Sequence, residues 1–454
     1  GNYHVHLYIY LKSKRMSEHL IELEIKDFRA IQEAKIALNG ITVLSGENGC
    51  GKSTIAKLTY HSIQTINQYE DIIYTPLLSF YKKTLEIFTD ISNDLSSLIP
   101  SPDPFIPEKY QYTVPNIPKI ISAISTIAQT LIANYHTAVN MDEADKNSPF
   151  FTRLKAILSS NFAIHEAKDK DWNSLIYEIL DSILKVQNYA DASVRNRSTE
   201  AFTGYLKTFF NNEDISDKFN LYEYGVGITN YQRQRLLHFR SIDKVLYIDT
   251  PVAIGLSSTH IPHWDFLNET LRKENENKPL DSDNIYQLLS ENILEGEASF
   301  DTKSIFNRFV YQRKDGLIIN LLDCATGIKS FAILQILLKN GYLDNKTLLI
   351  IDEPEAHLHP QWIVEYARII TLLNKELGVK FLIASHNPDM ISALKYIAEK
   401  EKVSDNLNFY LAEKTVTETY AYKALGSEID DIFGSFNIAI DRINQYGETY
   451  NEIF

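Results

Sequence analysis

The stretch SGENGCGKST, residues 45–54, restricts the possible folds of this chain more than any other segment. It follows the apolar run ITVLS at 41–45 and precedes a helical apolar period that begins at Ile55. A glycine-rich turn between a strand and a helix, ending in Gly-Lys-Ser, is typical of a loop whose backbone amides surround phosphates. A chance glycine-rich turn is the alternative, but the strand before it and the helix after it favour a phosphate loop.

Each residue type in such a loop has its own task. We expect Lys52 to reach the β- and γ-phosphate oxygens and to act in catalysis, and Ser53 to bind Mg²⁺ through its hydroxyl. The predicted ligands of the loop are therefore ATP and Mg²⁺. The nucleotide-binding candidates in it are Gly46, Glu47, Asn48, Gly49, Cys50, Gly51, Lys52, Ser53 and Thr54.

A second motif, LLIIDEPE at 348–355, supplies acidic side chains. Four apolar residues place Asp352 at the carboxyl end of a buried strand, where its carboxylate can hold Mg²⁺. Glu353 follows directly and can orient or deprotonate an attacking water as the catalytic base. Solvated charges at a strand end are the alternative, which the phosphate loop upstream makes less attractive. The two motifs together predict a nucleotide hydrolase.

Strand and helix patterns divide the chain into an α/β part and an inserted helical region. Apolar runs at 347–351 and 379–385 indicate buried strands with a helix between them, and 306–313 with 317–322 indicate a hairpin whose turn contains Asp-Gly. Strands that alternate with helices predict a mostly parallel sheet covered on both faces. The helical period over 69–240 predicts a large insertion of two bundles. The expected divisions are 1–15, a tag or leader; 16–68, a first lobe with the phosphate loop; 69–240, the helical insertion; and 241–454, a second lobe.

Composition limits the partners and the compartment of the chain. There are 45 Lys and Arg against 59 Asp and Glu, and the net charge of −14 repels polyanions on average. Nucleic-acid binding by this chain alone therefore receives no general support. Two cysteines exclude a disulfide framework and favour a cytoplasmic location. No apolar run is long enough to span a bilayer, so we expect no membrane partner.

Four segments, in the order GENGCGKST, ATGIKSF, LLIIDEPEAHLHP and ASHNPDM, carry a family resemblance. They resemble the cassette-type (ABC-class, AAA-type) ATPases of the OLD and SMC-related group. The resemblance implies a P-loop NTPase of the ABC/SMC head type, with an N-terminal antiparallel β subdomain beside the mostly parallel sheet. It also implies that two heads sandwich ATP face to face, so that the chain forms a homodimer or a higher homo-oligomer.

The same resemblance assigns roles to residues outside the two motifs. His386 would be the switch histidine near the γ-phosphate, with a catalytic role. Arg29, next to Phe28, falls where the family often contacts nucleotide. Residues 356–360 would form the loop that crosses the dimer interface. His357 and His359 in that loop have the H-x-H spacing that suits zinc, but no further Cys or His lies nearby in the sequence.

The signature segment departs from the cassette pattern. Where a cassette signature has serine, this chain has Ala325. In the OLD-like register, Thr326 supplies the hydroxyl, Gly327 lets the helix amides approach the nucleotide and Lys329 adds charge. An ordinary Thr-Gly helix start is the alternative. The glutamine of the family's second loop has no clear counterpart, and the segment after YIDTP is the only candidate for that loop.

The family resemblance extends to what the ATPase controls. Chains of the OLD type often carry a TOPRIM nuclease, but no Asp-x-Asp pair follows His386, and we expect no nuclease domain in this chain. The layout resembles the ATPase subunits of Septu-type and PARIS-type anti-phage systems. It therefore predicts that ATP-driven head dimerisation controls a separately encoded effector protein, a nuclease.

Two other functions stay open at this stage. An SMC-like or RecF-like ATPase of DNA repair or recombination is favoured by the local group Arg233, Arg235 and Arg240, and disfavoured by the net charge and by the lack of a coiled-coil arm. A transporter cassette is a weaker possibility, because such subunits rarely carry so large an insertion.

Overall fold

The structure is a computed structural model in which two compact units are distinguished. The sheet unit comprises the residues up to Asn67 and from Phe202 onward, and the helical unit comprises Gln68–Ala201. Residues 1–15, expected to be a tag or leader, lie outside the described residues. The structure describes residues 21–99, 111–141, 148–164, 170–256, 259–273, 283–302, 307–356, 358–434 and 444–445.

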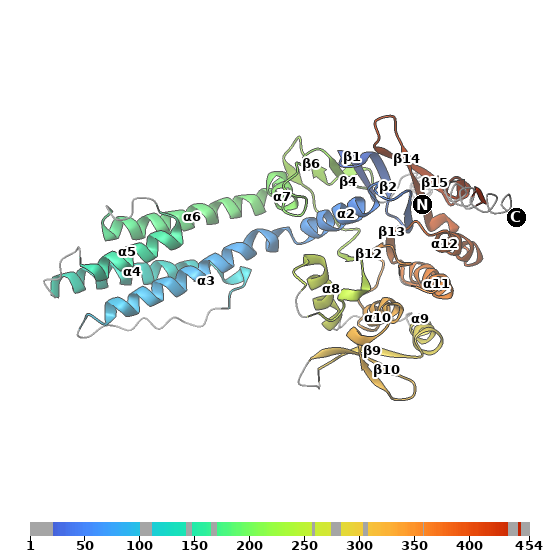
Figure 1. Ribbon diagram of the computed structural model, residues 1–454. Coiled ribbons are helices and arrows are strands. Elements are labelled where there is room, and N and C mark those ends of the chain that lie inside the picture. The colour runs from blue at the N-terminus through green and yellow to red at the C-terminus, as the bar shows by residue number, and fades with distance from the viewer. Residues whose placement is uncertain are drawn as a thin grey trace, which may run out of the picture. The chain divides into compact units, whose positions relative to one another are not determined.

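A ten-stranded mixed sheet is the centre of the sheet unit (Figure 1). Its order is β5-β4-β1-β2-β15-β14-β3-β13-β12-β8. From β14 to β8 all neighbours are parallel, whereas β5, β4, β1 and β2 pair antiparallel. The expected antiparallel N-terminal strands are therefore present, as one end of the same sheet. The strand bounds are β1 Ile21–Phe28, β2 Ile31–Ala37, β3 Ile41–Ser45, β4 Phe219–Glu223, β5 Val226–Gly227, β8 Lys244–Ile248, β12 Thr347–Asp352, β13 Lys380–Ala384, β14 Leu407–Lys414 and β15 Tyr420–Gly426.

Helices cover both faces of the parallel strands. Alternate side chains of a strand point to opposite faces, and Leu349 and Ile351 of β12 join the core formed with α10, α11 and α12. On the other face, Tyr247 of β8 packs against Tyr60 of α2, with ring centroids 5.9 Å apart. Helix α2 thus lies on the face opposite α10. The helix bounds are α2 Lys52–Asn67, α7 Thr199–Lys207, α8 Pro262–Arg272, α9 Asp283–Gln287, α10 Thr326–Lys339, α11 Pro360–Leu377 and α12 Pro388–Lys400.

Two smaller sheets complete this unit. The antiparallel sheet β11-β10-β9 contains the predicted hairpin, whose turn brings Gly316 to a φ of 88° and closes with a hydrogen bond from Gly316 N to Arg313 O at 3.0 Å. The Asp-Gly turn is therefore confirmed. Short single-turn helices, η2 Pro251–Ala253, η4 Leu321–Asp323 and η5 Ser404–Asn406, and the π-helix η3 Leu288–Ile293 connect the larger elements. The small strands are β6 Thr229–Asn230, β7 Arg235–Leu236, β9 Gly296–Asp301, β10 Arg308–Arg313 and β11 Ile318–Asn320.

The helical unit is one bundle with one core. Its helices are α3 Tyr69–Ser96, α4 Ile117–Met141, α5 Pro149–Phe162 and α6 Trp172–Asn196, with the short η1 Val114–Asn116 before α4. Apolar residues of all four long helices form a single buried cluster, in which Trp172 stacks on Tyr135 with ring centroids 4.7 Å apart. The expectation of two bundles was wrong, because the long helices α3, α4 and α6 share one apolar interface.

The helical region also ends earlier than the sequence pattern suggests. Contacts assign residues from Phe202 onward to the sheet unit, so the expected boundary at 240 is corrected to Ala201. The reason is strand pairing: β4 pairs with β1, with Leu221 opposite Leu23. No helix in the described ranges is both long and apolar enough to cross a membrane.

Candidate nucleotide-binding and hydrolysis site

The predicted phosphate loop connects β3 to α2 and is packed on two sides. Gly46 has a φ of 152° and Gly51 a φ of 99°, conformations that favour glycine. A Cβ on Gly46 would lie 2.7 Å from the Ala412 Cβ, and one on Gly51 would lie 2.7 Å from Ile31 Cγ1. Both glycines are therefore required by space as well as by backbone conformation, and the loop lies between β14 and β2.

Lys52, the first residue of α2, folds back over the loop. Its Nζ donates to the carbonyl oxygens of Gly46 at 2.8 Å and Glu47 at 3.0 Å, and the side chain is buried. The two loop carbonyls thus hold the Lys52 ammonium at the loop. The phosphate oxygens of a bound nucleotide would take the place of these carbonyls. The Cys50 side chain is fully buried, so only its backbone can face a ligand. Of the remaining loop residues, Glu47, Asn48, Gly49 and Ser53 are exposed and Thr54 is half-buried.

Asp352 ends β12 beside the phosphate loop. Its carboxylate lies close enough to the Ser53 side chain for the hydroxyl to act on its pKa, and its Oδ2 accepts from the Tyr247 hydroxyl at 3.2 Å. Burial raises the pKa of Asp352 above its usual range, and the nearby Ser53 hydroxyl and the hydrogen bond from Tyr247 oppose that rise. The fold therefore brings together the two predicted metal ligands, which are about 300 residues apart in sequence.

The donor set at this position fits Mg²⁺. A hydroxyl and a carboxylate are hard oxygen ligands, and Asp352 Oδ1 is buried without a hydrogen-bond partner in the described structure. Among the residues that the structure describes, no three His, Cys, Asp or Glu side chains are grouped to hold a metal ion by themselves. Phosphate oxygens and water would have to complete the coordination of the ion.

Glu353 and His386 form a pair at the ends of neighbouring strands. Glu353 Oε1 lies 3.4 Å from His386 Nδ1, and both side chains are about half exposed. Glu353 adopts a φ of 51°, uncommon for a residue with a side chain, and its N–H donates to Ala384 O at 2.8 Å. Such backbone strain is often found at functional sites. The predicted base and switch histidine therefore lie next to each other.

Behind this pair lies an acid that the sequence analysis did not single out. Glu355 Oε1 accepts from the Ser385 hydroxyl at 2.8 Å and from the His386 N–H at 3.3 Å, and lies 3.8 Å from His386 Nδ1. Burial raises the pKa of Glu355. The carboxylate holds the backbone at the end of β13, where His386 begins the loop to α12. The sequence offered one signal for Glu355, its position two residues after the predicted base Glu353.

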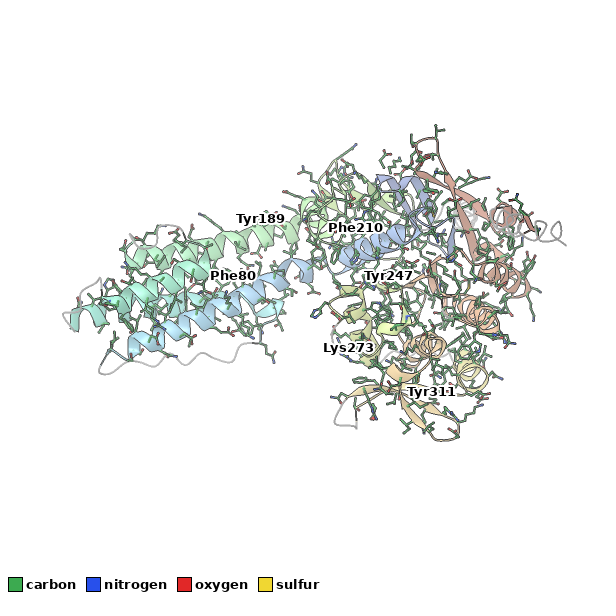
Figure 2. All side chains as sticks on the ribbon, viewed as in Figure 1. Phe80, Tyr189, Phe210, Tyr247, Lys273 and Tyr311 are labelled. Carbon is green, nitrogen blue, oxygen red and sulfur yellow. The ribbon has the colours of Figure 1, made fainter. Side chains whose placement is uncertain are left out.

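The sequence analysis also missed two residues near the carboxyl end of β8, Tyr247 within the strand and Asp249 directly after it. Tyr247 lies beneath α2 (Figure 2) and binds Asp352, as described above. Asp249 follows Ile248, which is opposite Ile351 of β12, so Asp249 ends at the same sheet edge as Asp352. Asp249 accepts from Trp264 Nε1 at 2.6 Å and is bonded to His263 Nε2 at 3.1 Å. Burial opposes its ionisation, but these two partners lower its pKa overall.

The segment after YIDTP, the candidate for the family's second loop, thus begins at this sheet edge. The only sequence signal for Asp249 was its place directly after an apolar run, and many strands end in this way.

The signature segment forms the N-terminus of α10, on the face of the sheet opposite the phosphate-loop helix α2. Thr326 begins the helix and is half-buried. Gly327 is packed under the Trp362 ring, where a Cβ would come within 2.8 Å of the indole. Lys329 differs from expectation: it is buried, and its Nζ donates to Leu322 O at 2.7 Å. Its ammonium therefore fastens η4 to α10 and is not presented on the surface.

Arg29 lies in the turn between β1 and β2, two residues before the Ile31 side chain that contacts the phosphate loop. Its guanidinium binds Glu213 Oε1 at 2.8 Å and lies over the rings of Phe28 and Phe210. A contact with nucleotide would require this ion pair to rearrange, and Arg29 stays a prediction.

The predicted H-x-H pair is only partly described. His357 lies outside the described residues, and His359 is exposed and caps α11 by accepting from the Gln361 N–H at 3.4 Å. Capping is an ordinary structural role for a side chain at this position.

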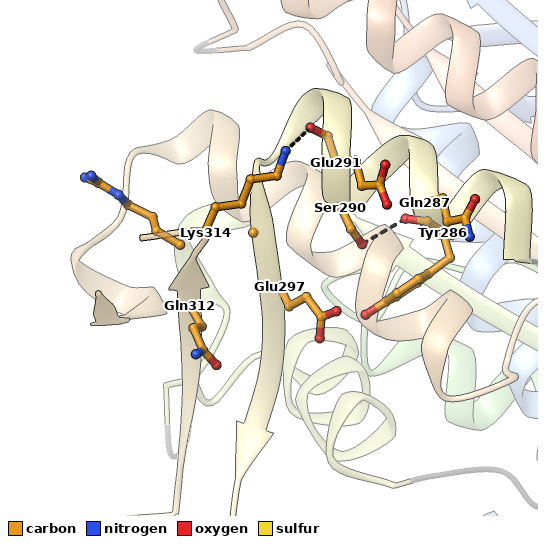
Figure 3. Close-up of a pocket in the computed structure, with 9 residues that line it drawn as sticks. Tyr286, Gln287, Ser290, Glu291, Glu297, Gln312 and Lys314 are labelled. Atoms are coloured by element: carbon orange, nitrogen blue, oxygen red, sulfur yellow. Dashed lines mark hydrogen bonds between the residues drawn. The ribbon is translucent and has the colours of Figure 1, made fainter. Parts of the chain in front are cut away.

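A separate pocket of about 550 Å³ opens between η3 and the sheet of β9 and β10 (Figure 3). Lys314 spans one side of it, donating to Glu291 O at 2.7 Å. None of the predicted site residues lines this pocket. Its lining residues are Tyr286, Gln287, Ser290, Glu291, Gly296, Glu297, Gln312, Arg313 and Lys314.

The sheet order and the phosphate loop define the class of the protein. A glycine-rich loop leads from β3 into α2, and the acidic end of β12 lies two strands away in a mostly parallel sheet with helices on both faces. This is the fold of a P-loop NTPase. Residues 19–391 match the AAA ATPase domain family, so the chain belongs to that family.

Similarity to individual proteins is more restricted. The Old nuclease of Escherichia phage P2 is 33% identical over 91 residues, which are 20% of this chain and 15% of that protein. The chain therefore spans a small part of the length of that curated relative. The structural alignment with the SMC head domain of Pyrococcus furiosus covers 93% of this chain and 98% of that domain's chain, with 11% identity and a TM-score of 0.33. The alignment with the cbiO1 protein of Clostridium perfringens covers 95% of this chain and 100% of that protein's chain, with 11% identity and a TM-score of 0.34.

Proposed function

We propose that two copies of this chain close around ATP and hydrolyse it, and that this cycle controls a separately encoded effector, a nuclease, in an anti-phage defence complex of the cytoplasm. The observation that carries the hydrolytic part is the meeting of Ser53, Asp352 and the Glu353–His386 pair at one edge of the sheet. A free pair of thiols, Cys50 and Cys324, suits a reducing compartment.

In this proposal each side chain has a defined task. Lys52 exchanges its two loop carbonyls for phosphate oxygens, and the loop amides bind the remaining charge. Glu353 accepts a proton from the water that attacks the γ-phosphate, and His386 holds the Glu353 carboxylate at 3.4 Å. Ser53 and Asp352 would hold Mg²⁺, which would supply positive charge to the phosphate oxygens.

A second copy would complete the site. The phosphate-loop helix α2 and the signature helix α10 lie on opposite faces of one sheet. In this proposal the N-terminus of α10, with Thr326, serves the nucleotide of a partner chain and not that of its own chain. A partner's helix N-terminus would bring positive potential to the γ-phosphate from the other side. This separation supports an active site divided between two chains.

Two observations support the link to an effector, namely a sequence similarity to a phage nuclease and an exposed aromatic surface on the helical unit. The shared segment with a phage nuclease favours a role in association with nuclease activity. The helical unit exposes aromatic side chains on α6, with Tyr177 58% and Tyr189 62% exposed. Exposed aromatic residues are enriched at protein interfaces. This unit is therefore our candidate for effector binding.

The Glu353→Gln variant tests the ATPase part. We expect turnover to fall about 100-fold or more, because water activation is lost. ATP affinity should stay within about twofold, because the contacts of the phosphate loop remain. Phosphate release, ATP binding by calorimetry and mass by light scattering would be measured, with the variant expected to be dimeric only with ATP. Glu376→Gln, an exposed change on α11, is the matched control. Full-speed hydrolysis by a monomer would contradict the proposal.

A pull-down with the products of adjacent genes tests the effector part. We expect an effector to copurify in one nucleotide state of the Glu353→Gln variant and to be released in the other, because closed and open dimers present different surfaces. Failure to recover a partner in either state would contradict effector control without affecting the ATPase proposal.

A DNA-repair or recombination ATPase is the second candidate. Arg233, Arg235 and Arg240 are all exposed around β7 in the sheet unit, forming a local basic group on a chain of net charge −14. ATP-dependent and salt-dependent binding of a labelled DNA duplex, abolished when the three arginines become serine, would favour this function.

A further inference from the structure

We propose that Tyr422 is a positioning residue of the phosphate loop: its hydroxyl fixes the peptide group between Cys50 and Gly51, so that the Gly51 N–H points to the bound phosphate. The inference rests on the proposed binding of nucleotide at this loop. Tyr422 belongs to β15, about 370 residues after the loop, and no motif connects the two.

The contact is direct and buried. Tyr422 Oη donates to the Cys50 carbonyl oxygen at 3.1 Å and lies 3.6 Å from Cys50 Sγ. Tyr422 is 8% exposed and the Cys50 side chain is fully buried, so little water can replace this hydrogen bond. Loss of the hydroxyl would leave a buried carbonyl without that donor, which is more costly than the loss of an exposed hydrogen bond.

Peptide geometry turns this contact into an effect on the ligand. The structure has no cis peptide bonds in its described part, so the Cys50–Gly51 peptide is trans and planar. In a trans peptide the C=O and the N–H point in opposite directions. A hydroxyl that holds the Cys50 carbonyl on the outside of the loop therefore directs the Gly51 N–H to the inside. Backbone amides directed inward are what bind phosphate in such a loop.

The rest of the C-terminal hairpin acts as a support for the same loop. Strand β14 runs parallel to β3, with Leu411 opposite Ser45, the last residue before the loop. The next residue, Ala412, occupies the space that a side chain on Gly46 would need. The hairpin thus contacts the loop at both ends, through Ala412 at Gly46 and through Tyr422 at Cys50.

The Tyr422→Phe variant tests the inference, because it removes the hydroxyl and keeps the ring. We expect the Kd for ATP to rise about 5- to 10-fold, the amount that one hydrogen bond contributes. KM should rise while kcat changes little, because the amide binds ground state and transition state alike.

Tyr410→Phe is the matched control. Tyr410 is a buried tyrosine of the adjacent strand β14 whose hydroxyl accepts from the Ala37 N–H at 2.9 Å, away from the loop. It should lose comparable thermal stability and retain ATP affinity. Equal ATP affinity in the Tyr422→Phe variant and the wild type, or an equal loss of affinity in both variants, would overturn the inference.

Hydrogen–deuterium exchange without nucleotide separates this inference from the proposed function. Peptides covering 46–52 should exchange faster in Tyr422→Phe than in Tyr410→Phe, because the loop loses a restraint. If the wild type does not bind ATP, the proposed function fails, but this comparison still reports on the restraint. Unchanged exchange in Tyr422→Phe would refute the restraint itself.

Discussion

At the residue scale, two glutamates of one motif have opposite surroundings. The Glu353 side chain is 47% exposed and can meet water, whereas the Glu355 side chain is 6% exposed and holds Ser385 and the backbone of His386. A base must reach its water, and a residue that positions a loop must not exchange its partners with solvent. These surroundings suit the base role that we propose for Glu353 and a positioning role for Glu355.

Burial of Glu355 gives a pH-dependent term in stability. Folding raises the pKa of Glu355 above the ordinary value of 4.5, so the folded protein holds this proton more tightly than the unfolded chain. The contribution of this proton to the free energy of unfolding is fully present below the pKa that Glu355 has in the unfolded chain. It is lost as the pH rises through the pKa that Glu355 has in the folded protein. We expect the wild type to lose about 1 kcal/mol relative to Glu355→Gln between pH 4.5 and pH 8.

Thermal denaturation of both proteins across this pH range measures the difference. Glu376→Gln, an exposed substitution on α11, should follow the wild type at every pH. If Glu355→Gln also parallels the wild type throughout, the folded-state pKa of Glu355 is not raised.

At the element scale, the N-terminus of α10 is determined by its packing. Gly327 lies against the rigid indole of Trp362, which itself packs edge-on against Phe331 with ring centroids 5.5 Å apart. The glycine of the signature segment thus has a structural role, besides the approach of helix amides to nucleotide that the family resemblance implies.

We expect Gly327→Ala to destabilise the protein by about 2 kcal/mol, because the new methyl group overlaps the Trp362 ring. Gly204→Ala in α7 is the matched control, because a Cβ there meets nothing within 4 Å. That change should stabilise the protein by about 0.5 kcal/mol through helix propensity. Chemical denaturation measures both, and equal effects of the two substitutions would contradict the packing argument.

At the scale of the whole molecule, the sheet unit and the helical unit each contain a hydrophobic core of their own among the described residues. One core contains the central strands with α10, α11 and α12, and the other contains α3 to α6. Because ligand binding stabilises only what it contacts or what is cooperative with it, nucleotide should act mainly on the sheet unit.

Hydrogen–deuterium exchange with ATP on the Glu353→Gln variant tests this division. At 100 times the Kd, ATP stabilises the bound unit by about 2.7 kcal/mol, so amides of β3, β12 and β13 should exchange more slowly. Amides of α4 and α5 should exchange at the same rate with and without ATP. Equal protection of the two units would mean that they unfold cooperatively.

The sequence by itself determined the features that depend on neighbours along the chain. The phosphate loop, the acidic strand end, the Asp-Gly hairpin and the helix between the two buried strands were all predicted, because turn chemistry and apolar periodicity are local. The family match and the sheet topology confirm the P-loop NTPase fold.

Only the tertiary structure decided what depends on strand pairing and burial. Residues 202–240 join the sheet unit because β4 pairs with β1, and the Lys329 side chain is buried with its ammonium donating a hydrogen bond to Leu322 O. Tyr422 and Glu355 became candidate positioning residues when folding brought them to Cys50 and His386. Such contacts join positions far apart in the sequence or depend on how a loop folds, and no local pattern encodes them.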